Sequence, residues 1–391
     1  MQRRKFILWG GQTALFSVAG LSSMANLNPL QYSSFLNLTS EPLAKELEKL
    51  IPKLMQEAKI PGLSIALVRN GQLSWSKGFG VKDQLSKKPV NPNTIFEIAS
   101  VSKTVFAYAV MKLCEKGIID LDIPLVQYAN IGFLDNDPRI NLITARHVLS
   151  HRSGLQNWRS QDDPIKLHFD PGTDFLYSGE GYYYLQSIVT QLTGKVNPNE
   201  CGSYEGDVKV CASDIGDYLE KNVLRPFGMN SSGYVWTEAI GKDQALPHDP
   251  NGQLITKPNQ TATDMARYAA AGGLLTSAND YARFIIGLFS PKENDPFILN
   301  KKRMMEMVRP HIKLREEQKI DGASSWALGW AVQERPEGNV ILHSGGQTGF
   351  KSLAMVSLEK KSGFVILTNC DNGAYVLNNP KVEKVLSRLF E

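Results

Sequence analysis

The chain has 391 residues, 42% of them hydrophobic and 21% charged, which is the composition of an ordinary globular protein with a sizeable core. Its formal net charge is +4, and Arg3, Arg4 and Lys5 at the amino terminus supply most of the excess. Because no basic tract follows them, the composition argues against nucleic acid as a partner. No later apolar run is long enough to span a bilayer, so no membrane span is expected once the first segment is removed.

Residues 1–25 have the features of an export signal. The basic residues precede a moderately apolar stretch at 6–19, and Ser23 and Ala25 place small side chains where a signal peptidase requires them. The paired arginines resemble a twin-arginine signal, with an ordinary secretory signal and an uncleaved anchor as the alternatives. We therefore expect an exported protein, periplasmic or secreted, with residues 26–41 as a linker and residues 42–391 as one domain.

Export permits disulfides, and the chain has four cysteines. Cys201 and Cys211 bracket a polar segment that looks like an insertion, and a bridge between them would stabilise the fold by roughly 3 kcal/mol in the chain-entropy model. Cys114 and Cys370 lie in apolar runs, so we expect both to be buried thiols.

The first part of the domain predicts a helix followed by a hairpin. Residues 41–59 are amphipathic, with leucines at 43, 47, 50 and 54 on one face, and Pro52 is expected to kink or break the helix. Two β-like runs follow at 62–69 and 72–80. The Asn70-Gly71 pair between them is a strong hairpin signal.

The rest of the chain predicts an α+β fold of the α/β sandwich type. Residues 120–310 are mostly helical or looped. Strand-like runs then return at 326–334, 339–343, 352–358 and 364–369, and a helix is expected at 379–391. The economical architecture is an antiparallel sheet built from N- and C-terminal strands and flanked by helices. The mainly helical region at roughly 120–310 is inserted into it, with a cleft between the two parts.

A serine and a lysine lie three residues apart where an apolar helix begins. Ser-x-x-Lys occurs three times, but Ser74–Lys77 falls on a strand and Ser357–Lys360 in a polar turn. Only Ser100 and Lys103 open a helix, which places them one turn apart on one face. A serine there lies near free backbone N–H groups, and a buried lysine beside it can accept its proton.

Two later stretches supply partners for acyl transfer. Tyr177 lies in a Gly- and Ser-rich loop before a helix, where it either shares a proton with a lysine or simply packs. In the stretch 341–350 a strand is expected to end in His343-Ser344-Gly345-Gly346, followed by a glycine turn. The N–H of Gly346 could pair with that of Ser100 as an oxyanion hole, and His343 could bind a substrate carboxylate or carbonyl. Alternatively, His343 is a strand-end histidine bonded to backbone.

The three stretches, in this order, resemble the serine β-lactamase and penicillin-binding-protein superfamily, whose signature is Ser-x-x-Lys, Ser-Asp-Asn and Lys-Thr-Gly. The pattern is most similar to the class C β-lactamases and related esterases and peptidases, whose second motif is Tyr-x-Asn. The resemblance runs from about residue 42 to 391 and includes LSHRSGL at 149–155 and AGGLLTSANDYARF at 271–284. It implies that Ser100 is the nucleophile and that Lys103 and Tyr177 share the acid/base work. It also places His343-Ser344-Gly345 at the Lys-Thr-Gly position and the Gly346 N–H in the oxyanion hole.

Two departures from the family pattern bear on the substrate. Gly179 stands where the family has the asparagine that contacts the substrate amide, and His343 replaces the lysine that helps bind the β-lactam carboxylate. We therefore predict a serine hydrolase that forms an acyl-enzyme on Ser100 and cleaves an ester, peptide or amide, with D-amino-acid and cell-wall-derived substrates included. A β-lactamase or penicillin-binding DD-peptidase is the alternative within the family, and an inactive binding protein of the same fold is the alternative outside enzymes.

His147 and His151 have the spacing of a zinc-binding helix, but Val148 stands where a glutamate base would be required and no third ligand is evident. The sequence therefore predicts no metal and no cofactor. The expected partner is a small-molecule ester, peptide or β-lactam-like substrate.

Overall fold

The computed structural model of the protein describes residues 29–129, 132–134, 136–160, 162–193, 215–256 and 268–391. The export segment expected at 1–25 and the cysteine pair Cys201 and Cys211 lie outside the described residues. The chain divides into two compact units, Met1–Pro42 and Leu43–Glu391, and the architecture below is that of the second. Cys114 and Cys370 are buried free thiols, as predicted.

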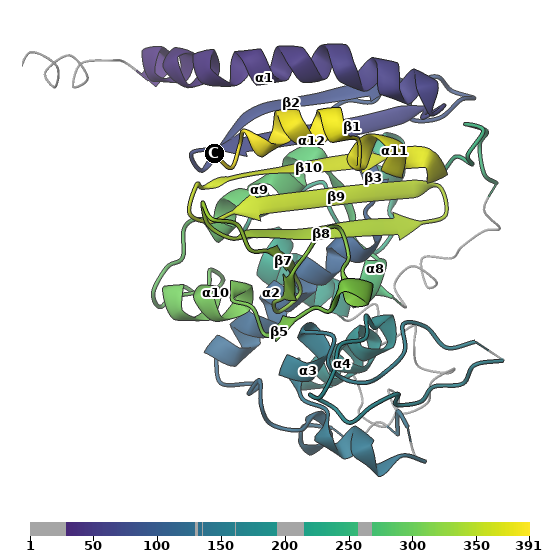
Figure 1. Cartoon of the computed structure of the whole chain (residues 1–391), viewed down its shortest axis with the longest axis vertical. Helices are drawn as coiled ribbons and strands as arrows, with labels where there is room; N and C mark the ends of the chain where they lie inside the picture. Colours follow the sequence, from purple (N-terminus) through teal and green to yellow (C-terminus); the bar gives the residue numbers. More distant parts are fainter. Residues whose placement is uncertain (1–28, 130–131, 135, 161, 194–214, 257–267) are drawn as a thin grey trace, which may run out of the picture. The chain divides into compact units, whose positions relative to one another are not determined.

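Strands from both ends of the chain form one eight-stranded sheet (Figure 1). Its order is β2-β1-β10-β9-β8-β7-β6-β5, and neighbouring strands are antiparallel throughout. The early strand β1 pairs with the late strand β10, which confirms the sheet predicted from the two ends. The strands are β1 (Gly62–Arg69), β2 (Gln72–Gly80), β5 (Ile312–Lys313), β6 (Ser325–Trp326), β7 (Ala331–Gln333), β8 (Val340–Gln347), β9 (Phe350–Ser357) and β10 (Ser362–Thr368).

The predicted hairpin between β1 and β2 is confirmed. Asn70 and Gly71 have φ values of 52° and 73°. Positive φ at both central residues matches the right-handed twist of the strands that the turn joins.

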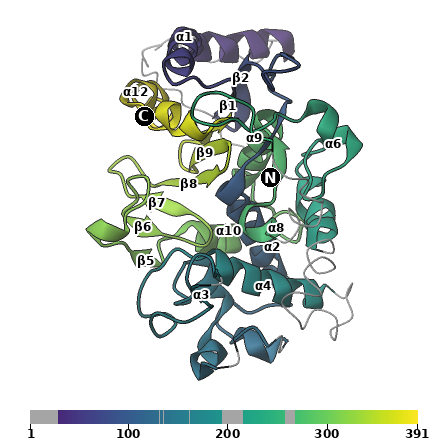
Figure 2. The same ribbon diagram turned by 90° about the vertical axis from the view of Figure 1, so that its right-hand side faces the viewer.

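Helices cover both faces of the sheet, and the alternation of side chains along β1 shows why. Ile65 and Leu67 belong to a core shared with α1 (Pro29–Glu57) and α12 (Pro380–Ser387), whereas Ala66 and Val68 belong to a core shared with α2 (Ser102–Glu115) and α9 (Ala278–Leu288). Successive residues of a strand point to opposite faces, so a strand that is buried over nearly its whole length, as β1 is, requires cover on both sides. Figures 1 and 2 show these two helical layers.

The remaining elements include a small second sheet. Its strands β3 (Ile95–Glu97) and β4 (Leu275–Ser277) pair just before the Ser100 turn and just after α8. The other helices are α3 (Ala145–Leu149), α4 (Gly179–Leu192), α6 (Glu238–Asp243), α8 (Ala269–Gly272), α10 (Lys301–Val308) and α11 (Ala374–Leu377). Shorter turns are η1 (Ala99–Val101), η2 (Leu125–Gln127), η3 (Pro138–Leu142), η4 (Glu220–Leu224), η5 (Glu316–Gln318) and η6 (Asp371–Gly373). In the described part of the chain, none of the helices combines the length and the apolar character that crossing a membrane requires.

Helix α1 (Pro29–Glu57) corrects two predictions. It begins at Pro29, so residues 29–41, assigned above to a linker, are helical; this stretch has no glycine and no proline between Pro29 and Pro42 to interrupt a helix. It also continues through Pro52 without a break. A proline removes one backbone hydrogen bond, and the apolar contacts of Ile51 and Leu54, both buried on either side of it, offset that loss.

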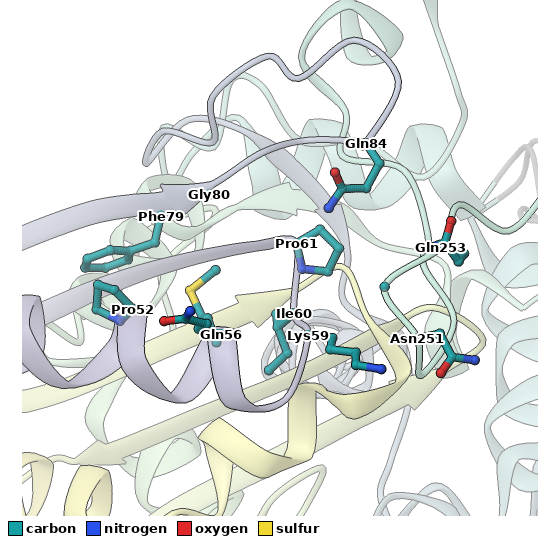
Figure 3. Close-up of a pocket in the computed structure, with 12 residues that line it drawn as sticks. Pro52, Gln56, Lys59, Ile60, Pro61, Phe79, Gly80, Gln84, Asn251 and Gln253 are labelled. Carbon is teal, nitrogen blue, oxygen red and sulfur yellow. The ribbon is translucent and has the colours of Figure 1, made fainter.

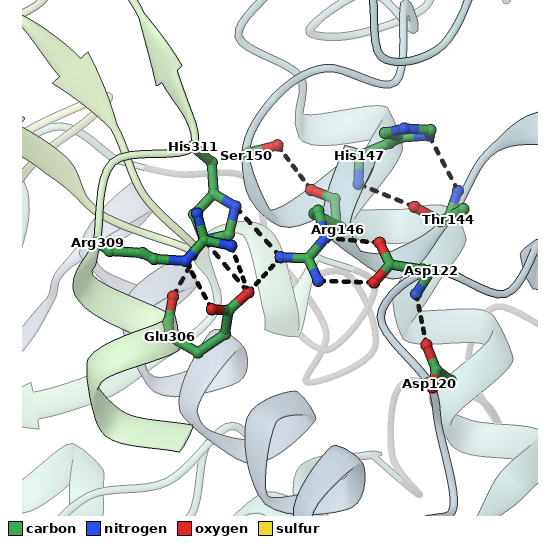
Figure 4. A network of polar contacts seen from close by, with 9 residues as sticks. All are labelled: Asp120, Asp122, Thr144, Arg146, His147, Ser150, Glu306, Arg309 and His311. Carbon is green, nitrogen blue, oxygen red and sulfur yellow. Dashed lines mark hydrogen bonds and ion pairs between the residues drawn. The ribbon is translucent and has the colours of Figure 1, made fainter. Parts of the chain in front are cut away.

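A partly buried ion network joins the helical region to the sheet (Figure 4). Arg146 of α3 donates to both carboxylate oxygens of Asp122, at 2.6 and 2.7 Å, and also to Glu306 of α10. Glu306 in turn accepts two bonds from Arg309. His311, which precedes β5, lies 3.3 Å from the Arg146 guanidinium. Burial lowers the pKa of His311 to about 4, so its ring is neutral and adds no positive charge here.

We expect Arg146→Met to destabilise the protein by about 1–2 kcal/mol, because the partly buried Glu306 carboxylate loses one of its two guanidinium partners and keeps only Arg309. Burial opposes ionisation of Glu306, but hydrogen bonds from Arg309 and Arg146 outweigh it and lower the pKa to about 2 from the ordinary 4.5. The stabilisation is therefore complete above pH 4.5 and is lost as the pH falls towards 2. Thermal melts of both proteins from pH 3 to 7 measure this. The control is Arg225→Met at an exposed pair, for which a small, pH-independent change is expected. Equal losses in the two variants would contradict the prediction.

Candidate active site

Ser100 lies on a strained turn that leads directly into α2. The turn is the short 3-10 helix η1, so the α-helix begins at Ser102 rather than at Ser100. Ala99 has φ of +48°, a left-handed conformation that is uncommon for a residue with a side chain. Ser352 and Ser102 hold the turn through bonds of 2.7 and 2.6 Å to the carbonyls of Ile98 and Ala99. Strain that is maintained in this way is typical of functional sites.

Lys103 places a buried amine beside the Ser100 hydroxyl. Its Nζ lies 3.1 Å from Ser100 Oγ and donates a 2.6 Å hydrogen bond to the carbonyl of Ala271, at the end of α8. Its other neighbours are the rings of Tyr177 and Tyr182, with centroids 5.1 and 5.4 Å from Nζ. Burial lowers the pKa of the Lys103 amine to about 7, because this surrounding does not stabilise the charged form. A large share of the amine is therefore neutral at physiological pH.

Tyr177 completes a cluster of three residues. Its hydroxyl is hydrogen-bonded to Ser100, and burial raises the pKa of the phenol, so the hydroxyl keeps its proton at neutral pH. The imidazole of His151 lies against the Tyr177 ring, with 4.2 Å between centroids, and its Nδ1 accepts a 3.0 Å bond from the N–H of Ser178. The structure thus brings together Ser100, Lys103 and Tyr177, and His151 orients the last of them.

Strand β8 passes close to the Ser100 backbone and is longer than the strand-like run predicted at 339–343. It continues through His343-Ser344-Gly345-Gly346 to Gln347. The predicted glycine turn follows at Gly349, where φ is +77°. Gly345 is needed for close approach: a Cβ atom there would lie 2.2 Å from the Ile98 oxygen and 3.2 Å from the Ser100 nitrogen. Glycine in a strand often marks such a contact.

One edge of β8 is open beside this contact. Strand β9 pairs with β8 from Ile341 to Gln347, whereas β7 pairs only with Val340 to Leu342. Among the described strands, none therefore pairs with the β7-side edge over His343, Ser344, Gly345 and Gly346. This stretch of the strand runs beside the Ser100 backbone.

His343 is buried and neutral in this site. Its Nδ1 lies 2.6 Å from the carbonyl of Ser344, so Nδ1 carries the proton, and Nε2 has no hydrogen-bond partner among the described residues. Burial, together with the nearby charge of Lys103, lowers the pKa of His343 to about 3. His343 therefore lacks the positive charge that a lysine would bring to this position. The bond of its Nδ1 agrees with the alternative given above, in which His343 is a histidine bonded to backbone.

Sequence reasoning did not identify Ala271 and His151 as part of the site. Both lie in strings that the family resemblance singled out, at 271–284 and 149–155, but their roles depend on the fold. His151 also belongs to the pair considered as zinc ligands. No group of three or more potential metal ligands lies together among the residues that the structure describes.

A separate pocket of about 530 Å³ lies away from this cluster (Figure 3). The described residues that line it come from the end of α1, the β1–β2 region and the loop at 251–253. They include Met55, Pro61, Phe79 and Gln253, but neither Ser100 nor its partners.

The family model described as Beta-lactamase matches residues 47–386. Protein flp from Staphylococcus aureus (strain N315) is 23% identical over 364 residues, which is 88% of this chain and 65% of that protein. This chain thus spans about 65% of the length of the first curated relatives that it matches.

Two solved structures show the same fold. A penicillin-binding protein homologue from Pyrococcus abyssi, described as octameric, has a TM-score of 0.68 at 26% identity and covers 89% of this chain and 80% of its own. A class C beta-lactamase has a TM-score of 0.70 at 20% identity and covers 90% of this chain and 97% of its own. These comparisons confirm the predicted fold and the resemblance on which it rested. The chain belongs to the beta-lactamase family.

Proposed function

We propose that this protein hydrolyses its substrate through a covalent acyl-enzyme formed on Ser100. One observation carries the proposal: a fully buried lysine with a pKa near 7 lies 3.1 Å from the Ser100 hydroxyl. Membership of the beta-lactamase family supports it. An inactive binding protein of the same fold would have no use for a buried amine, whose burial opposes its charged form and costs stability.

In the first half of the reaction, Ser100 Oγ attacks the carbonyl carbon and Lys103 accepts its proton. The carbonyl oxygen gains negative charge, and the groups that we propose to stabilise it are the backbone N–H groups of Ser100 and Gly346. The close approach of Gly345 to the Ser100 backbone supports this pairing. Tyr177 keeps its proton at neutral pH, and its hydroxyl is hydrogen-bonded to Ser100. It is therefore placed to pass this proton to the leaving group, while Lys103 returns a proton to the Tyr177 oxygen. In the second half of the reaction, water attacks the ester carbonyl of the acyl-enzyme. The protons then move in the reverse direction through Tyr177 and Lys103, and Ser100 Oγ regains its proton as the acyl group leaves.

The substrate that we propose is an ester, or a peptide or amide, including compounds with D-residues or derived from the cell wall. Gly179 and the neutral His343 remove an amide contact and a cationic carboxylate contact, respectively, so an efficient β-lactamase or DD-peptidase is the less favoured alternative. We further propose that residues 1–25 direct export to the periplasm or the exterior and that residues 42–391 form the catalytic domain.

Intact mass after treatment with a fluorophosphonate probe tests the acyl-enzyme assignment. Fluoride leaves phosphorus as Ser100 Oγ bonds to it, so we expect one adduct in the wild-type protein, mapped to the Ser100 peptide, and none in Ser100→Ala. An adduct of equal yield in the variant would contradict the assignment. A parallel exposure to benzylpenicillin separates the substrate classes: a lasting adduct indicates a penicillin-binding peptidase, consumption of penicillin indicates a β-lactamase, and unchanged penicillin favours esters and small peptides.

A further inference from the structure

Trp158 fills the space that a side chain at position 179 would occupy. Gly179 begins α4, two residues after Tyr177, and a Cβ atom built on it would lie 2.4 Å from two atoms of the Trp158 indole and 2.7 Å from a third. Those atoms belong to a rigid ring rather than to the end of a flexible chain. Glycine is therefore required at position 179 as long as Trp158 keeps its place.

A network around Glu180 fixes the indole there. Arg159, which follows Trp158 in the chain, forms a bidentate ion pair with Glu180 through bonds of 3.0 and 2.7 Å. The backbone N–H of Arg159 donates to the same carboxylate at 2.9 Å. Glu180 is 2% exposed. Asn157, on the other side of Trp158, accepts bonds from the N–H groups of Gly179 and Glu180 at 3.0 and 2.9 Å. Both neighbours of Trp158 are thus bonded to the start of α4.

The indole also reaches the opposite side of the catalytic cluster. Its ring meets that of Tyr268 edge to face, with 5.0 Å between centroids. Tyr268 lies three residues before Ala271, whose carbonyl holds the Lys103 amine. Trp158 therefore connects the Tyr177 segment to the start of α8, the two segments that flank Lys103. Trp158 remains 42% exposed, so these neighbours do not enclose it.

We propose that Trp158 is a specificity-determining residue of this site and that it selects acyl groups with an apolar chain over acyl groups that carry an amide. The inference rests on the proposed acyl transfer to Ser100. An amide set against the indole carbons would lose its bonds to water without gaining an acceptor or donor, whereas an apolar chain gains contact area there. The chain therefore favours apolar acyl esters rather than the acylamino compounds to which an asparagine at position 179 would bond.

Two chromogenic esters of matched length test this. The acyl groups of p-nitrophenyl 4-phenylbutanoate and p-nitrophenyl hippurate differ only in that an amide replaces two methylene groups. Each kcat/KM is divided by the rate of alkaline hydrolysis of the same ester, which corrects for intrinsic reactivity. For the wild-type protein we expect the normalised ratio to favour the phenylbutanoate at least tenfold.

Variants at position 158 then link that ratio to the indole. We expect Trp158→Leu, which keeps an apolar wall, to retain most of the preference. In Trp158→Gln, and further in the double variant Trp158→Ala/Gly179→Asn, the ratio should fall about tenfold or more towards the hippurate. The matched control is Trp236→Ala: Trp236 is 46% exposed and covers Gly241 in the same way, and the ratio should not change.

Several outcomes would overturn the inference. They are a wild-type ratio near one, a ratio unchanged in Trp158→Gln, or an equal shift in Trp236→Ala. Melting curves identify a variant that fails to fold, in which case the Leu and Gln variants are compared with each other. The proposed function fails in a different way, through hydrolysis of both esters that persists in Ser100→Ala.

Discussion

Replacing Ser100 with alanine is expected to lower kcat/KM for an ester substrate by about 10⁴-fold or more. The hydroxyl is the group that forms the covalent bond, and the structure places Lys103 and Tyr177 around that single oxygen. Lys103 and Tyr177 act on the Ser100 hydroxyl, so they lose most of their effect on the rate when that hydroxyl is removed. Only substrate binding and oxyanion contacts then still accelerate the reaction. Steady-state hydrolysis of p-nitrophenyl esters measures the loss.

The chain supplies a matched control for this experiment. Ser74 also precedes a lysine by three residues, but it lies on β2 and its hydroxyl bonds the carbonyl of Leu67. We expect Ser74→Ala to keep activity within about twofold. Comparable activity in Ser100→Ala and Ser74→Ala would overturn the assignment of Ser100 as the nucleophile.

The second large effect is a pH dependence that belongs to Lys103. Burial lowers the pKa of this amine to about 7, and the amine must be neutral to accept a proton. The logarithm of kcat/KM should therefore rise with unit slope below pH 7 and level off above it. The neighbouring groups do not titrate in this range: burial lowers the pKa of His343 to about 3 and that of His151 well below its usual value, and burial raises the pKa of Tyr177.

Substitution of Lys103 should remove both the rate and the slope. We expect Lys103→Met to lose about 10²–10⁴-fold in kcat/KM and to show no rise through pH 7. The exposed Lys116 at the end of the same helix is the control, and Lys116→Met should keep the wild-type profile. A rise through pH 7 that persists in Lys103→Met would assign the titration to another group.

A stability measurement separates this loss from misfolding. The unfolded amine binds its proton up to about pH 10.5, whereas the buried amine releases it near pH 7, so burial destabilises the folded protein at neutral and low pH and this cost falls as the pH rises from 7. Lys103→Met removes the cost. Its melting temperature at pH 7 should therefore equal or exceed that of the wild type, with a smaller difference at pH 9.

The distribution of local patterns was sufficient to predict much of the fold. Two short β-like runs and the Asn70-Gly71 turn between them identify β1 and β2, because strand propensity and turn chemistry depend on adjacent residues. The spacing of Ser100 and Lys103 indicates a common helical face for the same reason. Boundaries were less accurate where a distant contact overrides the local preference. The strand β8 continues through Gly345 and Gly346, since Gly345 packs against the Ser100 turn rather than bending the chain.

The sequence by itself determined which chemistry-bearing residues the chain carries: Ser100, Lys103, Tyr177 and the string that begins at His343, in an order that resembles a known family. Only the tertiary structure decided what those residues can do. The carbonyl that holds Lys103 is 168 residues away in the chain, so neither that bond nor the burial that lowers the pKa of the lysine is a property of any local segment. The same holds for two other residues. Burial keeps His343 neutral, and glycine is required at position 179 because Trp158 occupies the space of a side chain there. Desolvation and packing depend on the whole fold, and they set the protonation states and the free space on which the reaction depends.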